Sequence, residues 1–193
     1  CPINIRRTEA LKNKCNAIYF FDRIQAQHYM ENGVAGAKHL PLAADVDTFR
    51  PALAKDDNYA CDVAFVGKLY KSDYSYISNY QDVYTKGYLE GIVETQQKLY
   101  GGYIIDDCIN DNIMKHINEN FANVSNGSYS VIKPEVTYAL ATEVTSRERF
   151  MALALLQNRC NVNLYSTDVD ERLNNVNNRG YIDYYSQMPK AFY

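Results

Sequence analysis

Apolar runs and helical spacing alternate in the first part of the chain. Residues 16–21 (NAIYFF) form a nearly continuous apolar run, which predicts a buried strand of a parallel sheet. Residues 23–31 have a pattern compatible with one short helix, and Asn32-Gly33 predicts its end. A second strand is predicted over residues 37–42 (AKHLPL). The order of strand, helix and strand indicates a βαβ unit of a doubly wound α/β sheet.

A polar stretch then interrupts this pattern. Residues 48–58 (TFRPALAKDDN) show no periodicity and contain Pro51, so we predict a linker over residues 51–60. Residues 62–66 (DVAFV) are mostly apolar and end in Gly67-Lys68. This run predicts the first parallel strand of a second α/β unit.

Helical periodicity dominates the middle of the chain. Apolar residues recur at helical intervals over residues 83–100 and 104–121, which predicts two helices. A third helix is predicted to start at Pro134. Thr145 is followed three residues later by Glu148, a capping-box pattern that predicts another helix start before FMALALL.

Strand signals return near the end of the sequence. Residues 161–165 (NVNLY) and 180–184 (GYIDY) predict two short strands, and Met188-Pro189 predicts the start of a further helix. The second unit is therefore predicted to be a parallel α/β sheet with a helical insertion over residues 74–143.

Composition and charge narrow the classes of function. The chain is 47% hydrophobic and 22% charged, as expected of a globular domain, and its net charge is −3. Scattered basic residues and a negative net charge disfavour a nucleic-acid partner. The sequence has no apolar run of membrane-spanning length and no signal-peptide pattern. We therefore expect a cytoplasmic protein without a membrane span.

The two ends of the sequence predict a piece of a longer protein. The chain starts at Cys1 and stops in MPKAFY, which is typical of the opening of a helix, so we expect a cut at both ends. The first unit would then have an open sheet edge. We expect either a helix over residues 5–15 or a second copy of the chain, as a homo-oligomer, to cover that edge.

Cysteine, histidine and tyrosine usage gives weaker signals. Five widely spaced cysteines without a C-x-x-C pair, and three solitary histidines, predict reduced buried thiols and neither a metal site nor a disulfide framework. The 18 tyrosines suit half-buried sugar- or protein-binding surfaces, although a biased genome is the better explanation for most of them. The residues concerned are Cys1, Cys15, Cys61, Cys108, Cys160, His28, His39 and His116.

Gly67-Lys68 is the first candidate site, because doubly wound folds bind ligands at the carboxyl ends of their strands. Glycine there would let a phosphate approach the backbone, but the residues alone favour a simple turn. Arg147 and Arg149 would lie in the first turn of the FMALALL helix. A guanidinium there could reach a diphosphate in the same crevice, or could pair with Glu148 or Glu143.

Acidic residues after the later predicted strand give a further set of candidates. Asp168, Asp170 and Glu171 follow NVNLY and could face a ligand, although polar loop residues are usually only solvated.

Several phrases together resemble a known family. FFDRIQAQHYMENGVAGAKHLPLAADVDTFRP, YACDVAFVGKLY, YLEGIVETQQKLYG, SRERFMALALL, NVNLYST and GYIDYYSQMPKAFY follow one another in the order found in CgeB-type, spore-maturation-associated glycosyltransferase-like proteins of bacteria. The resemblance spans nearly the whole chain. It implies a GT-B fold, in which two Rossmann-like domains hold a nucleotide-sugar donor and an acceptor in the cleft between them.

The family pattern also assigns regions and residues. It implies that residues 1–50 end the N-terminal domain and that residues 61–193 begin the C-terminal, donor-binding domain. It further implies that Gly67 and Lys68 face the donor diphosphate, that Arg149 adds to this contact, and that residues Gly180, Tyr181 and Ile182 lie near the nucleotide base. Glu135 and Glu143 have the spacing of the paired glutamates of many retaining glycosyltransferases, but their predicted place on an early helix indicates coincidence.

The implied function is sugar transfer from a nucleotide-sugar donor to an unknown glycan or protein acceptor, with no metal ion and no other cofactor. The catalytic residues stay unknown because the strands that would carry a catalytic base are absent, so this piece alone is expected to be inactive. The alternative is a non-catalytic sugar- or nucleotide-binding or protein-interaction module for spore or cell-surface assembly, with contacts from the Tyr-rich insertion. A response-regulator-like domain, suggested by Asp22 at a strand end, ranks last.

Overall fold

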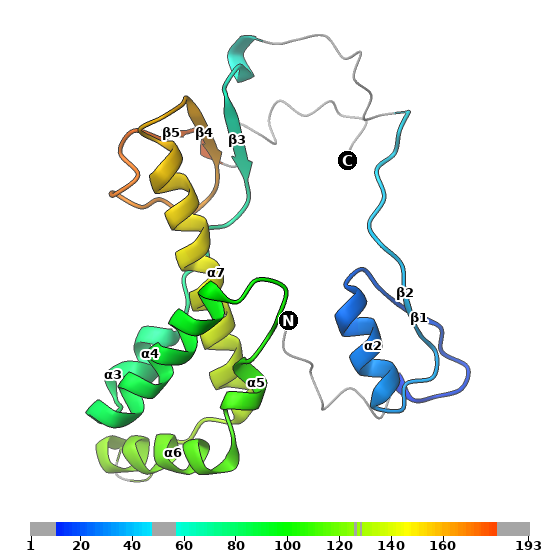
Figure 1. The fold of residues 1–193 in the computed structure, drawn as a ribbon, viewed down its shortest axis with the longest axis vertical. Coiled ribbons are helices and arrows are strands. Elements are labelled where there is room, and N and C mark those ends of the chain that lie inside the picture. The colour runs from blue at the N-terminus through cyan, green and yellow to red at the C-terminus, as the bar shows by residue number, and fades with distance from the viewer. Residues whose placement is uncertain (1–10, 48–56, 126, 128, 181–193) are drawn as a thin grey trace. The chain divides into compact units, whose positions relative to one another are not determined.

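The protein forms two compact units that divide after Lys55 (Figure 1). This computed structural model describes residues 11–47, 57–125, 127 and 129–180. The two units are described separately. Most of the predicted linker, and residues 5–10 of the helix expected to cover the sheet edge, lie outside the described ranges.

The first unit is a small parallel βαβ motif. Strand β1 (Ile18–Phe20) leads into helix α2 (Arg23–Glu31), and strand β2 (Ala37–His39) pairs with β1 in parallel. The predicted βαβ order is therefore confirmed. Strand β2 was predicted to extend to residue 42 but ends at His39. Pro41, two residues later, has no amide hydrogen to donate to a neighbouring strand.

Local contacts explain the start and end of α2. The Asp22 carboxylate accepts the amide hydrogen of Gln25 at 2.7 Å, so Asp22 is a helix N-cap. Gly33 has a φ of +88°, which suits the turn that ends the helix. The helix packs on the sheet through Tyr29, whose ring stacks on Phe20 with ring centroids 4.6 Å apart.

The second unit contains a three-stranded parallel sheet. Its strand order is β3 (Val63–Val66), β4 (Val162–Tyr165) and β5 (Asn177–Asn178), so β4 is central and all four of its residues are buried. The predicted strands at β3 and β4 are confirmed. The sequence did not predict β5, whose asparagines have no apolar pattern, and all of the predicted strand 180–184 except Gly180 lies outside the described residues.

The chain between β3 and β4 folds into a layer of helices. After the 3₁₀ turn η2 (Asp57–Tyr59) and strand β3, the helices are α3 (Tyr74–Asn79), α4 (Val83–Lys98), α5 (Ile105–Cys108), α6 (Asp111–Ser125) and α7 (Lys133–Leu156). Their fully buried side chains form one apolar core, which includes Leu89, Val93, Ile105, Ile109, Ile117, Val136 and Leu140. None of the helices in these ranges is long and apolar enough to cross a membrane.

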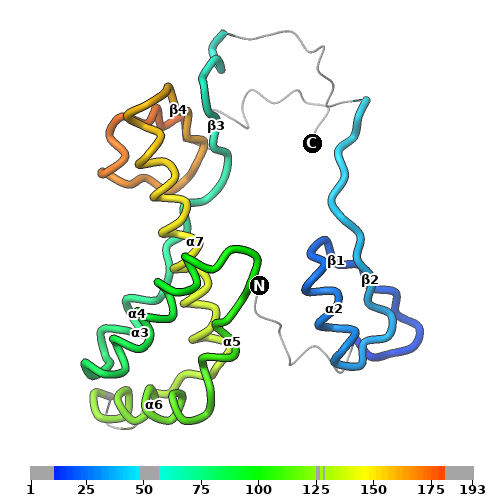
Figure 2. The backbone as a smooth tube through the Cα atoms, in the orientation of Figure 1, coloured from blue at the N-terminus to red at the C-terminus, as the bar shows by residue number. Residues whose placement is uncertain are grey.

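Helix α7 joins this helical core to the sheet. It runs for 24 residues from the helical cluster to the strands (Figures 1 and 2). Val136, Leu140 and Val144 belong to the helical core, whereas Leu153 belongs to a second core with Val162 and Leu164 of β4. The two cores therefore share one rigid element.

The single helix predicted over residues 104–121 is wrong, because the chain forms α5 and α6 with a break between them. The side-chain oxygen of Asn110 accepts the amide hydrogens of Asn112 and Ile113 at 3.0 and 3.1 Å, so it caps α6. The buried isoleucines keep a spacing of four residues across the break. The apolar pattern therefore concealed the interruption.

The helix start predicted at Thr145 is also wrong. Thr145 lies inside α7, where its hydroxyl donates to the carbonyl oxygen of Ala141 at 2.9 Å. The helix begins near Pro134, as predicted, and the Glu135 carboxylate accepts the amide hydrogen of Ile132 at 3.0 Å. As a consequence, Arg147 and Arg149 lie in the middle of a long helix and not in its first turn.

Alanine substitutions of Asn110 and Thr145 distinguish a helix cap from a position inside a helix. Asn110→Ala should lower the free energy of unfolding by about 1 kcal/mol, because it removes an N-cap. Thr145→Ala should change it by less than about 0.5 kcal/mol, because alanine favours a helix interior. Urea unfolding followed by circular dichroism measures both. The opposite ranking would contradict the observed helix boundaries.

Candidate functional site

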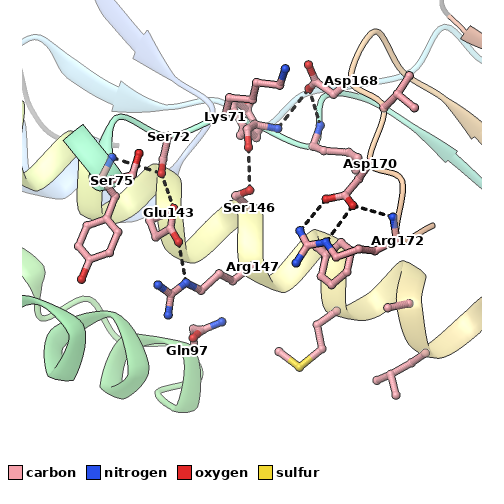
Figure 3. Close-up of a pocket in the computed structure, with 18 residues that line it drawn as sticks. Lys71, Ser72, Ser75, Gln97, Glu143, Ser146, Arg147, Asp168, Asp170 and Arg172 are labelled. Carbon is pink, nitrogen blue, oxygen red and sulfur yellow. Dashed lines mark hydrogen bonds and ion pairs between the residues drawn. The ribbon is translucent and has the colours of Figure 1, made fainter. Parts of the chain in front are cut away.

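A cavity of about 780 Å³ lies at the carboxyl ends of β3 and β4 (Figure 3). Loops that follow parallel strands meet at one edge of a sheet, which is where doubly wound proteins bind their ligands. Here the loops after β3 and β4 form two walls, and the second half of α7 forms the third. Helix α3 contributes two residues and α4 contributes one. The lining residues are Leu69, Tyr70, Lys71, Ser72, Tyr74, Ser75, Gln97, Glu143, Ser146, Arg147, Phe150, Met151, Ala154, Leu155, Asp168, Val169, Asp170 and Arg172.

The loop after β3 is held by three separate contacts. The Asp168 carboxylate accepts the amide hydrogens of Leu69 and Tyr70 at 2.8 and 3.3 Å. The Ser146 hydroxyl donates to the carbonyl oxygen of Tyr70 at 2.7 Å. Tyr70 has a φ of +63°, a left-handed conformation that a non-glycine residue adopts at some cost. The surrounding contacts offset that cost.

Arg149 supplies the third contact and turns its guanidinium toward the loop. It donates to the carbonyl oxygen of Lys68 at 2.5 Å, and its guanidinium carbon lies 4.7 Å from the ring centroid of Tyr70 and 5.6 Å from that of Phe65. A Cβ atom placed on Gly67 would lie 3.5 Å from Arg149 Nη1. Arg149 therefore covers the side of the loop at Gly67 and does not line the cavity.

Arg147 forms an ionic network with two glutamates. Its Nε donates to Glu143 at 2.7 Å, and both of its terminal nitrogens donate to Glu90, with Nη2 at 3.1 Å from Oε2. The Tyr74 hydroxyl donates to Glu90 at 2.8 Å, and the Ser72 hydroxyl donates to Glu143. The network joins α3, α4, α7 and the loop after β3 along one wall of the cavity.

The contacts of the network shift the pKa values of Glu90 and Tyr74. The hydrogen bond from Arg147 holds the pKa of Glu90 below its ordinary value. Burial, followed by the hydrogen bond to Glu90, raises the pKa of Tyr74 above its ordinary value. At neutral pH the network therefore contains a charged Arg147 guanidinium and a neutral Tyr74 phenol on the cavity wall, with the charged Glu90 carboxylate behind them.

The opposite wall carries a second ion pair. Arg172 contacts Asp170 through Nη2 at 2.6 Å, and this arginine holds the pKa of Asp170 below its ordinary value. The Arg172 guanidinium carbon also lies 3.9 Å from the ring centroid of Phe150. Among the described residues that line the cavity, Lys71 is the cation without a hydrogen-bond or ion-pair partner.

The residues predicted for the donor site lie near the cavity but do not form its walls. Gly67 and Lys68 follow β3 and precede the first lining residue, and Arg149 faces the same loop. Gly180 follows β5, where its amide donates to the side chain of Asn178 at 3.1 Å. Tyr181 and Ile182 lie outside the described residues.

Other candidates from the sequence do line the cavity. Glu143, Arg147, Asp168 and Asp170 contribute to its walls, whereas Glu135, Glu148 and Glu171 do not. Sequence reasoning missed Lys71, Ser72, Tyr74 and Ser75, because the short helix α3 was not predicted and its preceding loop had no motif. It also missed Gln97, which lies on a predicted helix but carries no motif that indicates a site.

The cysteines and acidic residues give no metal site in the described ranges. Groups of three or more His, Cys, Asp or Glu side chains that could hold an ion do not occur there. The four described cysteines are free thiols; Cys15 is exposed and the other three are partly exposed, so the expectation of buried thiols is wrong. Asp22 caps α2, which explains its place at a strand end.

No protein-family model, curated protein or solved structure matches this chain.

The network around Arg147 predicts a pH-dependent contribution to stability. Arg147→Met should lower the free energy of unfolding by about 1–2 kcal/mol at pH 7, a modest value because the side chains are about one-third exposed. Since the pKa of Glu90 is depressed in the folded state, this difference should be full above the unfolded pKa of about 4.3 and should shrink as the pH falls below it.

Urea unfolding between pH 3 and pH 7 measures this difference. Lys115→Met is the matched control, because Lys115 pairs with Glu119 on the surface at 3.8 Å. The control should change stability little at any pH. A deficit of Arg147→Met that stays constant down to pH 3 would contradict the assigned charge of Glu90.

Proposed function

We propose that the chain binds a nucleotide-sugar donor in the cavity at the carboxyl ends of β3 and β4, as part of a glycosyltransferase of GT-B type. The observation that carries this proposal is the position of the cavity at the ligand-binding edge of a parallel sheet. Its volume of about 780 Å³ falls within the roughly 300–1,000 Å³ typical of small-molecule sites. The resemblance of the sequence to CgeB-type proteins supplies the reaction class.

The chemistry of the walls suits a ligand with many hydroxyl groups. Carboxylates, guanidiniums and serine hydroxyls line the cavity together with the rings of Tyr74 and Phe150. A guanidinium has five N–H donors, and Arg147 donates three hydrogen bonds to Glu90 and Glu143. The remaining donors are held in place by the network and are free to bind a sugar or phosphate oxygen.

Lys71 is the proposed partner of the donor diphosphate. The arginines of the cavity wall are neutralised by carboxylates, whereas Lys71 has no ionic partner among the described residues. A positive charge near the leaving diphosphate would stabilise the charge that develops as the glycosidic bond breaks. In this proposal the acceptor and the catalytic base come from outside the cavity. The four free thiols fit the reducing cytoplasm.

A pair of lysine variants tests the proposal. Lys71→Ala should weaken binding of the preferred donor by about tenfold, because one charge-assisted contact to phosphate is lost. Lys68→Ala removes an equal charge three residues away, outside the cavity lining, and should have a smaller effect. Thermal shift with UDP-, GDP-, ADP- and dTDP-sugars identifies the donor, since a ligand of the folded state raises the melting temperature.

The two outcomes of this screen have different meanings. If the donor-induced shift in melting temperature is lost in Lys68→Ala and kept in Lys71→Ala, the donor binds at the Gly67-Lys68 loop and not at Lys71. A complete absence of shifts, in this chain and in any longer form that contains it, would reject nucleotide-sugar binding.

An aromatic cluster favours a second candidate, a non-catalytic module that binds a glycan. The rings of Tyr76, Tyr80 and Tyr129 surround the buried Phe121, with centroid distances of 6.1, 5.6 and 5.4 Å to it. These tyrosines are 45%, 39% and 43% exposed. Half-buried phenol rings offer apolar faces and polar hydroxyls, which suits the mixed surface of a sugar.

The second candidate has its own test. A cell-surface polysaccharide should bind to the wild-type chain, and binding should fall severalfold in the double variant Tyr80→Ser, Tyr129→Ser. Tyr100→Ser is the control, because Tyr100 is fully exposed and is not part of the cluster. Equal loss in both variants, measured by calorimetry, would reject the aromatic cluster as the binding surface.

A further inference from the structure

Two consecutive backbone amides converge on one atom at the wall of the cavity. The N–H groups of Leu69 and Tyr70 both donate to Oδ2 of Asp168, at 2.8 and 3.3 Å. Successive amides that point at one spot, with a residue in the left-handed conformation, form a small concavity that binds anions. Tyr70 provides that conformation with its φ of +63°. The carboxylate of Asp168 is the anion that fills this concavity.

The loop keeps its shape through contacts that do not involve Asp168. Ser146 donates to the carbonyl oxygen of Tyr70, and Arg149 donates to that of Lys68 while lying over the Tyr70 ring. Both residues belong to α7, which is anchored in two apolar cores. The two amides are therefore oriented by α7, and Asp168 occupies an arrangement that it does not create.

The concavity is open to other anions. Leu69, Tyr70 and Asp168 all line the cavity, and Asp168 is only partly buried. The adjacent Lys71 has no partner among the described residues and adds positive charge at the same wall. An anionic group that enters the cavity would therefore meet amides already aligned for it, and would compete there with a carboxylate.

We propose that the amides of Leu69 and Tyr70 form a phosphate-binding subsite in which Asp168 acts as a built-in competitor. A phosphate group of a ligand displaces the Asp168 side chain and accepts both N–H bonds. Displacement breaks the hydrogen bonds that join Asp168, on the loop after β4, to the loop after β3. The loop after β4 also carries Asp170 and Arg172, so phosphate binding is coupled to the position of the opposite wall. The subsite itself requires only a phosphate; its use for a nucleotide sugar rests on the function proposed above.

Inorganic pyrophosphate is the probe, used with Asp168→Ala. Removing the competitor should tighten pyrophosphate binding by about tenfold or more, because two hydrogen bonds to a charged group become available without displacement. Asp170→Ala is the matched control: it removes the same charge from the same wall and leaves the two amides paired. Calorimetry at constant ionic strength measures affinity, so that general screening does not contribute.

The amide resonances of Leu69 and Tyr70 provide a second readout that does not depend on activity. In Asp168→Ala they should shift on titration with pyrophosphate, and in Asp170→Ala the same shifts should need about tenfold more pyrophosphate, because Asp168 must first be displaced. If Asp168→Ala does not fold, Asp168→Asn replaces it, because asparagine keeps an acceptor oxygen and loses the charge; tighter pyrophosphate binding is again expected.

Two results would overturn the proposal. One is an affinity of Asp168→Ala, or of Asp168→Asn in its place, that is no higher than that of Asp170→Ala. The other is tighter binding without any change at the Leu69 and Tyr70 amides. Since the probe contains no sugar or nucleoside, the subsite can be confirmed even if every nucleotide sugar fails to bind. Equally, a nucleotide sugar can bind in the cavity even if pyrophosphate does not bind at this subsite.

Discussion

The second unit depends on the continuity of α7. This helix of 24 residues spans about 36 Å and lies in two apolar cores, with Leu140 in the helical layer and Leu153 against the sheet. Residues 145–149, between the two cores, belong to neither of them, and Ser146 and Arg147 in this stretch line the cavity. Ser146, Arg147 and Arg149 can therefore act as fixed points for the loop after β3 and for α4.

The charges around the cavity are arranged so that few of them are free. Arg147 is bound by two glutamates and Arg172 by an aspartate, and Asp168 is bound by two backbone amides. Such pairing limits the gain in stability from each contact, because desolvation offsets much of the attraction between half-buried charges. What it provides is position: each polar group of the wall is held in one orientation before any ligand arrives.

The sequence predicted the elements with strong local patterns and missed those that depend on neighbours. Apolar runs predicted β1, β3 and β4, and helical spacing predicted α2 and α4. Strand β5 has no apolar pattern, since Asn177 and Asn178 pair with β4 through backbone and amide groups. The cap at Asn110 was missed and a false one was assigned to Thr145, because both residue types occur at caps and inside helices alike.

The cavity lies at the edge of the sheet where the sequence predicted a site, but most of its lining residues were not predicted. Gly67 and Lys68 follow β3, yet the walls come from the next residues of that loop, from α7 and from the loop after β4. Local patterns determine neither the path of these loops nor which side of α7 faces the cavity. Arg147 and Arg149 show the reason. They are two residues apart, about 200° around the helix, so one faces α4 and the other faces the loop after β3.

Because α7 belongs to both the helical layer and the sheet core, the helical layer is not a separable insertion. Residue 143, where the insertion was expected to end, lies inside α7. Deleting the layer up to that residue would therefore remove about half of the helix that supports the sheet. Any replacement of the layer would have to supply the first half of α7 again.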